Sequence, residues 1–303
     1  MGDERSRDER SREERAGMSL AYEQLRQVTP LAGVVLAANP SAMTLDGTNT
    51  WLLRDEPGRR QAVVVDPGPD EEAHLASVLE AAGTVALILL THGHADHAEG
   101  ARRLHELTGA PVHALDPAHR YGSEGLAEGA VLDAAGVQIQ VWATPGHTAD
   151  SLCFVLPRTA GGESAGGGAA GGGSAGGRSA GLGLAAAVLT GDTILGRGST
   201  VVAPPDGVLA DYLASLRRLT ALAGVAVLPG HGPELADAGA AARGYLAHRE
   251  QRLAQVRQAL AEGGPDLSAM DVVRQVYADV DPALWPAAEW SVQAQLAYLR
   301  AIA

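Results

Sequence analysis

Four apolar segments of this chain each lead into a small residue and then into side chains that can bind metal. The first segment, residues 85–90, runs into the heptapeptide Thr91-His92-Gly93-His94-Ala95-Asp96-His97. The same order recurs in three later segments, which contain His147, Asp192 and His231. Short apolar runs of this length are typical of buried strands. Because side chains that follow the same ends of several strands can meet in one cleft, we expect a layered fold with a polar site at one edge.

Apolar periodicity divides the chain into a region of strands and helices and a region of helices alone. Between residue 18 and about residue 230, short apolar runs alternate with amphipathic segments, which predicts a layered α/β domain. We expect strands over residues 50–53, 61–65, 85–90, 111–114, 137–143, 151–156, 185–189 and 225–228, and helices over 70–82, 98–108 and 211–223. The helix over 70–82 is expected to begin at Asp70 as its N-cap. After residue 233 we expect only helices, over 234–262, 268–278 and 286–303.

This pattern predicts a main domain over residues 18–250 and a helical C-terminal region over residues 251–303. Residues 1–17 alternate arginine with aspartate and glutamate, so we expect a disordered, solvated tail there. Residues 159–183 contain 12 glycines among alanines and serines, a composition typical of a flexible loop. Because this run lies between two expected strands, we interpret it as a long hairpin loop inside the main domain.

Charge and residue usage exclude several classes of protein. The formal net charge is −13, from 23 cationic and 36 acidic side chains, which disfavours an unaided grip on nucleic acid or on an anionic membrane. All the cationic side chains are arginine, so Schiff-base chemistry and a phosphate-loop lysine are excluded. The single cysteine, Cys153, excludes an internal disulfide, and we expect it in the core.

The apolar run at residues 85–90 is too short to span a membrane. The charged residues 1–17 do not resemble a secretory signal. We therefore expect a soluble, cytoplasmic protein with no membrane partner.

The heptapeptide Thr91–His97 is the strongest chemical signal in the sequence. It places three histidines and one aspartate within six residues, and imidazole and carboxylate groups are ligands that zinc prefers. Imidazoles this dense repel one another once protonated and have little structural use without a metal. The alternative is a polar loop in which Asp96 caps the next helix. Taken alone, His147, Asp192 and His231 would each be ordinary loop residues.

Five further histidines fit none of these positions. We expect surface or core roles for four of them, which are His74, His105, His113 and His119. His248, in the helix expected over 234–262, could reach the rim of the cleft, but we favour a position on the helix surface.

In their order along the chain, the candidate ligands resemble the signature of the metallo-β-lactamase superfamily. That signature is a His-x-His-x-Asp-His motif followed by a histidine, an aspartate and a final histidine. All seven positions are filled here, and the resemblance extends over about residues 39–232. It implies an αββα sandwich, in which two sheets pack face to face with helices outside, and it implies a hydrolase.

The resemblance also implies a centre with two divalent metal ions. Seven residues would hold them: His92, His94 and His147 for the first ion, Asp96, His97 and His231 for the second, and Asp192 between the two. Zinc suits these ligands best, although iron and manganese accept them as well. A hydroxide that bridges the two ions would be the nucleophile.

Two carboxylates would have additional roles in this centre. Asp96 would be catalytic as well as a ligand, by orienting the nucleophile or moving its proton. Asp66 would brace the His-rich loop from behind the ligands. The alternative for Asp66 is a turn aspartate that precedes a proline.

Individual positions narrow the resemblance within the superfamily. Many of its β-lactam hydrolases have a cysteine where this chain has Asp192, and its redox di-iron members have a glutamate where this chain has His94. Neither antibiotic hydrolysis nor electron transfer is therefore favoured. Four segments, residues 39–40, 45–51, 191–196 and 245–249, resemble the beta-lactamase-like protein 2 group, which lies close to the glyoxalase-II-like enzymes. That group implies endoribonuclease activity on single-stranded RNA and a small helical, winged-helix-like C-terminal region.

Three hypotheses for the function follow. The first is a dinuclear metal-dependent hydrolase of the beta-lactamase-like protein 2 type that cleaves RNA phosphodiesters, although the acidic charge lowers the attraction for RNA. The second is a thioesterase of the hydroxyacylglutathione hydrolase type, acting on a small-molecule ester or thioester. The absence of lysine weakens it, because that family commonly grips its anionic thiol carrier with basic residues. The third is a non-catalytic metal-binding scaffold whose helical tail binds partners.

Overall fold

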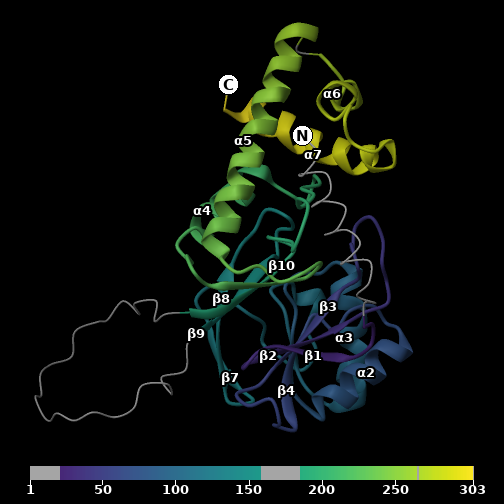
Figure 1. The fold of residues 1–303 in the computed structure, drawn as a ribbon, viewed down its shortest axis with the longest axis vertical. Coiled ribbons are helices and arrows are strands. Elements are labelled where there is room, and N and C mark those ends of the chain that lie inside the picture. Colours follow the sequence, from purple (N-terminus) through teal and green to yellow (C-terminus); the bar gives the residue numbers. More distant parts are fainter. Residues whose placement is uncertain (1–20, 158–184, 265, 303) are drawn as a thin grey trace, which may run out of the picture.

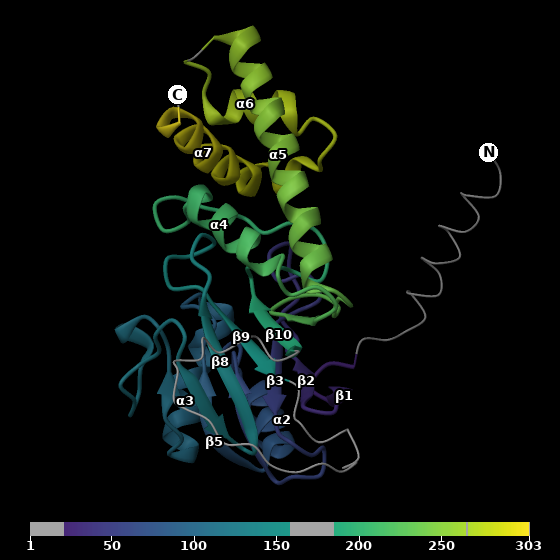
Figure 2. The ribbon, with the colours of Figure 1, turned by 90° about the vertical axis from the view of Figure 1, so that its left-hand side faces the viewer.

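A computed structural model describes residues 21–157, 185–264 and 266–302 of the chain. The strands form two sheets, and Figures 1 and 2 show these sheets packed against each other with helices on both outer sides. The αββα sandwich expected from the resemblance is thus confirmed. The expected tail at residues 1–17 and the glycine-rich run at residues 159–183 lie outside the described residues.

The first sheet contains six strands in the order of the sequence. They are β1 (Leu25–Thr29), β2 (Ala32–Leu36), β3 (Asn49–Leu53), β4 (Gln61–Val65), β5 (Thr84–Leu89) and β6 (Val112–His113). Strands β1 to β4 pair antiparallel, whereas β4, β5 and β6 run parallel. Parallel neighbours need a crossover connection, and the helices α2 (Glu72–Ala82) and α3 (Ala95–Thr108) provide the two crossovers.

The second sheet contains five strands in the order β11-β10-β9-β8-β7. Their bounds are β7 (Val131–Ala134), β8 (Val137–Ala143), β9 (Leu152–Pro157), β10 (Ala185–Gly191) and β11 (Ala226–Pro229). Helix α4 (Leu209–Leu219) connects β10 to its parallel neighbour β11. Strand β9 pairs in antiparallel orientation with β10, the next described strand along the chain.

Strand β4 contributes side chains to two buried clusters, one on each face of its sheet. Its side chains alternate between the two faces of the sheet. Val63 and Val65 face the second sheet and share a buried cluster with Phe154 of β9. Ala62 and Val64 face outward into the cluster that packs under α2 and α3. Burial on both faces explains why the sequence of this strand is almost continuously apolar.

A third buried cluster joins the outer face of the second sheet to the C-terminal helices. It contains Cys153 of β9, Tyr212 of α4 and Val292 of α7, so the core position predicted for Cys153 is confirmed. Helix α5 (Ala238–Gly263) runs from the sandwich to α6 (Ala269–Val276) and α7 (Trp285–Ala301), as Figure 2 shows. The boundary predicted at residue 250 falls inside α5 and stays a prediction.

Several expected boundaries were wrong. The sequence pattern missed β1, β2 and β7. Helix α2 begins at Glu72 rather than at Asp70, and the Asp70 carboxylate instead lies 3.3 Å from Arg103 Nη1. Helix α3 begins at Ala95 rather than at residue 98, which places Asp96 and His97 in its first turn.

Among the described helices, none combines the length and the apolar character that crossing a bilayer requires.

Candidate metal centre

Each predicted ligand lies just beyond the end of a strand. The His-rich heptapeptide follows β5 of the first sheet. His147, Asp192 and His231 follow β8, β10 and β11 of the second sheet. The fold therefore brings together side chains that are far apart in the sequence, and all seven predicted ligands fall into overlapping groups that could hold metal.

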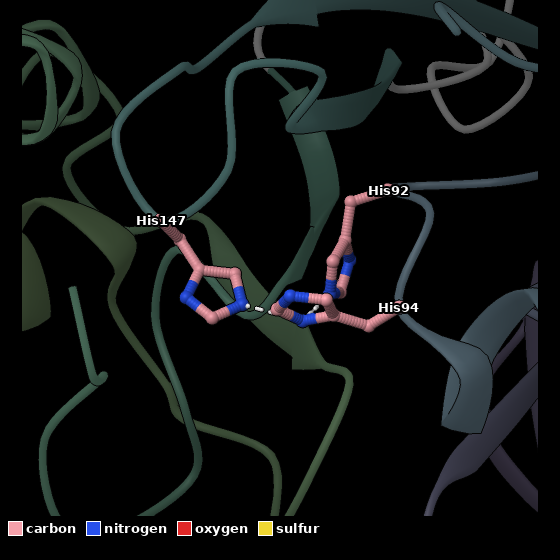
Figure 3. Close-up of side chains that lie close together, drawn as sticks. All are labelled: His92, His94 and His147. Atoms are coloured by element: carbon pink, nitrogen blue, oxygen red, sulfur yellow. Dashed lines mark hydrogen bonds between the residues drawn. The ribbon is translucent and has the colours of Figure 1, made fainter. Parts of the chain in front are cut away.

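Three histidines form the first group, and Figure 3 shows their rings converging. His94 Nδ1 lies 3.0 Å from His92 Nε2 and 3.1 Å from His147 Nε2. Around a tetrahedral zinc ion with bonds of about 2.0–2.1 Å, two ligand nitrogens lie about 3.3 Å apart. The spacing of these three nitrogens therefore fits one ion.

The second group consists of Asp96, His97 and His231. His231 Nε2 lies 3.1 Å from His97 Nε2 and 3.1 Å from Asp96 Oδ2. His97 Nε2 lies 3.6 Å from the same carboxylate oxygen. These distances again fit the donors around one ion.

Asp192 lies between the two groups. Its Oδ1 is 3.5 Å from both His97 Nε2 and His231 Nε2, whereas its Oδ2 is 3.8 Å from His147 Nε2. Oδ1 is buried and accepts no hydrogen bond from the described residues. Gly230 permits this approach, because a Cβ there would lie 2.6 Å from His97 Cε1 and 2.7 Å from Asp192 Oδ1. The two oxygens of one carboxylate thus face different groups.

Three of the imidazoles donate a hydrogen bond from Nδ1 to a carboxylate or carbonyl oxygen, so that Nε2 points into the cluster. The partners are the Asp66 carboxylate for His97 at 3.0 Å, the Val201 carbonyl for His147 at 2.8 Å and the Gly47 carbonyl for His231 at 3.1 Å. A proton held on Nδ1 leaves the lone pair of Nε2 free, which is the form in which histidine binds metal. The second-sheet end that carries His231 is in turn tied to β3, because Asn49 Nδ2 donates to Pro229 O at 3.0 Å.

Asp66 lies directly beneath the His-rich loop and is 1% exposed. It accepts hydrogen bonds from the Thr91 backbone N–H at 2.8 Å, from the Thr91 hydroxyl at 2.7 Å and from His97 Nδ1. These three contacts favour the predicted bracing role over that of a turn aspartate.

The charges of the cluster favour the binding of cations. Burial opposes ionisation of Asp192, but the imidazoles of His231 and His97 outweigh it and hold the pKa of this carboxyl well below its usual range. Burial likewise opposes a charge on His97, yet Asp192 and Asp66 raise its pKa well above the usual value. Burial and the neighbouring imidazoles lower the pKa of His92, which keeps that ring neutral. The carboxylates thus attract cations into the site.

A cleft of about 400 Å³ opens beside His94. His119, at the end of the short helix η1 (Pro117–His119), lies over Gly93, where a Cβ would be 2.6 Å from its Nε2. The remaining polar wall consists largely of three carboxylates, those of Asp116, Asp150 and Asp206. No arginine is among the described residues that line this cleft.

The sequence pattern did not predict that Asp116, His119, Asp150 and Asp206 belong to the site. The signal was nevertheless present, because residues 114–119 follow a strand just as the ligand segments do. Of the other histidines, His74 is buried and contacts Thr50 Oγ1 at 2.9 Å, and His105 Nδ1 donates to Ala110 O at 2.7 Å. His248 lies on α5 and is not among the residues that line the cleft.

Two parts of the chain match known protein families. Residues 43–231 match the family model described as the metallo-beta-lactamase superfamily. The chain belongs to the metallo-beta-lactamase superfamily. It is therefore a hydrolase, and the scaffold hypothesis loses its basis. Residues 268–301 of this superfamily protein match the beta-lactamase associated winged helix domain, which confirms the winged-helix-like character expected of the C-terminal region.

Two relatives in the superfamily cover most of the chain. A beta-lactamase-like protein 2 homolog from Drosophila melanogaster is 31% identical over 285 residues, which are 88% of this chain and 86% of that protein. An atrochrysone carboxyl ACP thioesterase from Passalora fulva is 29% identical, with 84% of this chain and 70% of that protein covered.

Two solved structures show the same fold. A metallo-beta-lactamase family protein from Thermus thermophilus aligns with a TM-score of 0.68 at 21% identity, over 91% of this chain and 95% of that one. A beta-lactamase domain protein from Burkholderia ambifaria aligns with a TM-score of 0.70 at 23% identity, over 95% of this chain and 91% of that one.

Proposed function

We propose that this superfamily protein is a dinuclear metal-dependent hydrolase that cleaves acyl thioesters. The position of Asp192 carries the dinuclear part of the proposal, because its two oxygens face different groups of imidazoles at 3.5 Å and 3.8 Å. A carboxylate between two cations offsets their mutual repulsion at the separation of about 3.5–4 Å found in two-metal sites. The buried Oδ1, which has no donor among the described residues, supports the same assignment.

The ligands follow from the two groups of side chains. His92, His94 and His147 would hold one ion, while Asp96, His97 and His231 would hold the other. Sites rich in imidazole with some carboxylate suit zinc, so zinc is the metal that we propose.

Two bound zinc ions would supply Lewis acidity and lower the pKa of water toward neutrality. The chain's own residues add positioning and proton transfer. The Asp96 side chain is 30% exposed, whereas that of Asp192 is 13% exposed. Asp96 can therefore orient the attacking water and accept its proton. His119 and Asp150, on the cleft wall beside Gly93, can form hydrogen bonds with polar groups of the substrate.

The cleft wall supports a thioester over RNA. RNA would bring a negatively charged backbone against Asp116, Asp150 and Asp206. The acyl part of a thioester and its reacting carbonyl are uncharged, so this part of the substrate meets no such repulsion, whereas an anionic thiol carrier would have to lie away from these three carboxylates. The Passalora fulva relative, which is named a thioesterase, supports this substrate class.

Phosphodiester cleavage in single-stranded RNA is the second candidate. It is favoured by the resemblance to the beta-lactamase-like protein 2 group and by the 31% identity to a homolog of that name. For either substrate, a cytoplasmic location remains part of the proposal.

One experiment tests the metal requirement and the substrate together. The zinc-loaded protein is assayed against a series of acyl thioesters and against a fluorogenic single-stranded RNA, before and after prolonged chelation. We expect thioester turnover that chelation abolishes and added zinc restores, since the nucleophile depends on the metal. Metal analysis by mass spectrometry of the same samples gives the identity and number of the ions.

The His94→Ala variant serves as the matched negative control. RNA cleavage with intact thioesters would replace the first candidate with the second. Full activity in a protein that mass spectrometry shows to be free of metal would contradict the mechanism for both substrates.

A further inference from the structure

The segment from Asp192 to Val201 connects two of the proposed ligands. The Thr200 hydroxyl donates to the backbone carbonyl of Asp192 at 2.8 Å. The carbonyl of the next residue, Val201, accepts the hydrogen bond from His147 Nδ1 at 2.8 Å. The Thr200–Val201 segment therefore contacts the backbone of Asp192 and the imidazole of His147 at the same time.

Arg249 of α5 holds this peptide from the side of the C-terminal helices. Its Nη2 donates to the carbonyl of Thr200. The guanidinium lies over the ring of Tyr212, with its central carbon 5.1 Å from the ring centroid. Arg249 is 3% exposed, so this contact is sealed from solvent. Two anchors, one hydrogen bond and one ring face, fix the guanidinium in place.

Two tyrosines hold the other part of the same segment. The Tyr212 hydroxyl donates to the carbonyl of Thr193 at 2.8 Å, and the Tyr245 hydroxyl accepts from the Leu195 backbone N–H at 3.0 Å. Tyr212 belongs to α4 and Tyr245 to α5. The two helices outside the second sheet thus bind the segment at several points, and Arg249 binds the peptide whose two residues contact both ligands.

The burial of Arg249 is costly in free energy. No carboxylate lies within ion-pair distance of it in the part of the chain that the structure describes. A buried cation without a charged partner is less favourable than a well-packed apolar side chain of similar size. The contribution of Arg249 is therefore better explained by the geometry that its planar, multiply donating group imposes than by stability.

We propose that Arg249 is a positioning residue for the metal centre, which fixes Asp192 and His147 through the Thr200–Val201 peptide. The inference rests on the proposed dinuclear site. It assigns to a helix of the C-terminal half a direct influence on metal affinity.

The test compares Arg249→Met with Arg252→Met. Arg252 is a matched control on the same helix, because it also lies over a tyrosine ring, 4.4 Å from the centroid of Tyr277, and donates to a backbone carbonyl, that of Val276 at 2.8 Å. Its contacts point to α6 instead of the metal centre. Zinc affinity is measured by competition with a chromophoric chelator, and cobalt substitution adds a visible spectrum that reports ligand geometry.

We expect Arg249→Met to weaken zinc binding by about 10- to 100-fold, the usual effect of removing a group that orients a ligand, and to change the cobalt spectrum. Arg249→Lys should recover part of the loss. Thr200→Val, which removes the hydroxyl contact with Asp192, should weaken zinc binding in the same direction. Arg252→Met should bind zinc as the wild type does, even if its melting temperature falls as far as that of Arg249→Met.

Wild-type zinc affinity in Arg249→Met and Thr200→Val would overturn the inference. A loss of zinc affinity in Arg252→Met equal to that in Arg249→Met would also overturn it, because the loss would then reflect a general loss of stability. If Arg249→Met does not fold, the Thr200→Val and Arg249→Lys proteins decide the matter by the same readouts. Failure of the wild type to bind zinc would instead contradict the proposed dinuclear site itself.

Discussion

Asp192→Asn is expected to lower kcat/KM for a thioester by about 10³-fold or more and to reduce the zinc content from the proposed two ions per chain to one or none. Neighbouring imidazoles hold the pKa of Asp192 well below its usual range in spite of burial, so the carboxyl is ionised at neutral pH. Asparagine keeps the size of the side chain but removes the charge that would lie between the ions. The several kcal/mol of charge stabilisation that metal ions supply in such reactions correspond to a loss of about this size, at 1.36 kcal/mol per factor of ten.

The measurements are steady-state kinetics with a thioester and metal analysis of the purified variant. Asp211→Asn is the control, because Asp211 is an exposed aspartate on α4, and it should match the wild type in both. An Asp192→Asn protein that retained two zinc ions and lost less than about tenfold in kcat/KM would rule out a bridging role.

Asp66→Ala is expected to lower the free energy of unfolding by about 3–5 kcal/mol, the usual cost of removing one partner of a buried charged pair. The variant leaves the Thr91 N–H, the Thr91 hydroxyl and His97 Nδ1 without their acceptor. It also frees the His97 ring to rotate, so zinc affinity should fall as well. Urea unfolding of metal-free and zinc-loaded protein separates the two effects.

Asp70→Asn is the matched control for this substitution. Asp70 lies four positions further along the chain, and its ion pair with Arg103 is exposed, with side-chain accessibilities of 43% and 40%. Exposed pairs of this kind contribute about 0–1 kcal/mol, so the control should unfold close to the wild type. An unfolding midpoint of Asp66→Ala equal to that of Asp70→Asn would show that the buried contacts of Asp66 do not stabilise the folded protein.

The sequence was most informative where chemistry and strand pattern coincided. The dense imidazoles of Thr91–His97 have few uses besides metal binding, and they end an apolar run that folds as β5. His147, Asp192 and His231 follow their strands in the same way, so their convergence could be predicted from the order alone. The αββα sandwich came from the resemblance, since periodicity by itself did not distinguish one sheet from two.

The sequence was least informative where position depends on packing. Strand β1 (Leu25–Thr29) is mostly polar and lies at the edge of its sheet, so it has no apolar pattern to detect. His119 of η1 and Asp206 of the segment after β10 line the same cleft only because the two sheets pack against each other. Arg249 resembles any other arginine on a helix, and its contact with Thr200 becomes visible only once the second sheet and α5 are docked.

The ligands come from both sheets, with the His-rich heptapeptide after β5 and the other three residues after strands of the second sheet. A pair of zinc ions bound there would cross-link the two sheets of the sandwich. The chain has a single cysteine, which cannot form an internal disulfide. Because a ligand that binds only the folded state stabilises it by an amount that grows with free ligand concentration, the free energy of unfolding would depend on the zinc supply. Zinc starvation would then lower the stability of the fold as well as the proposed activity.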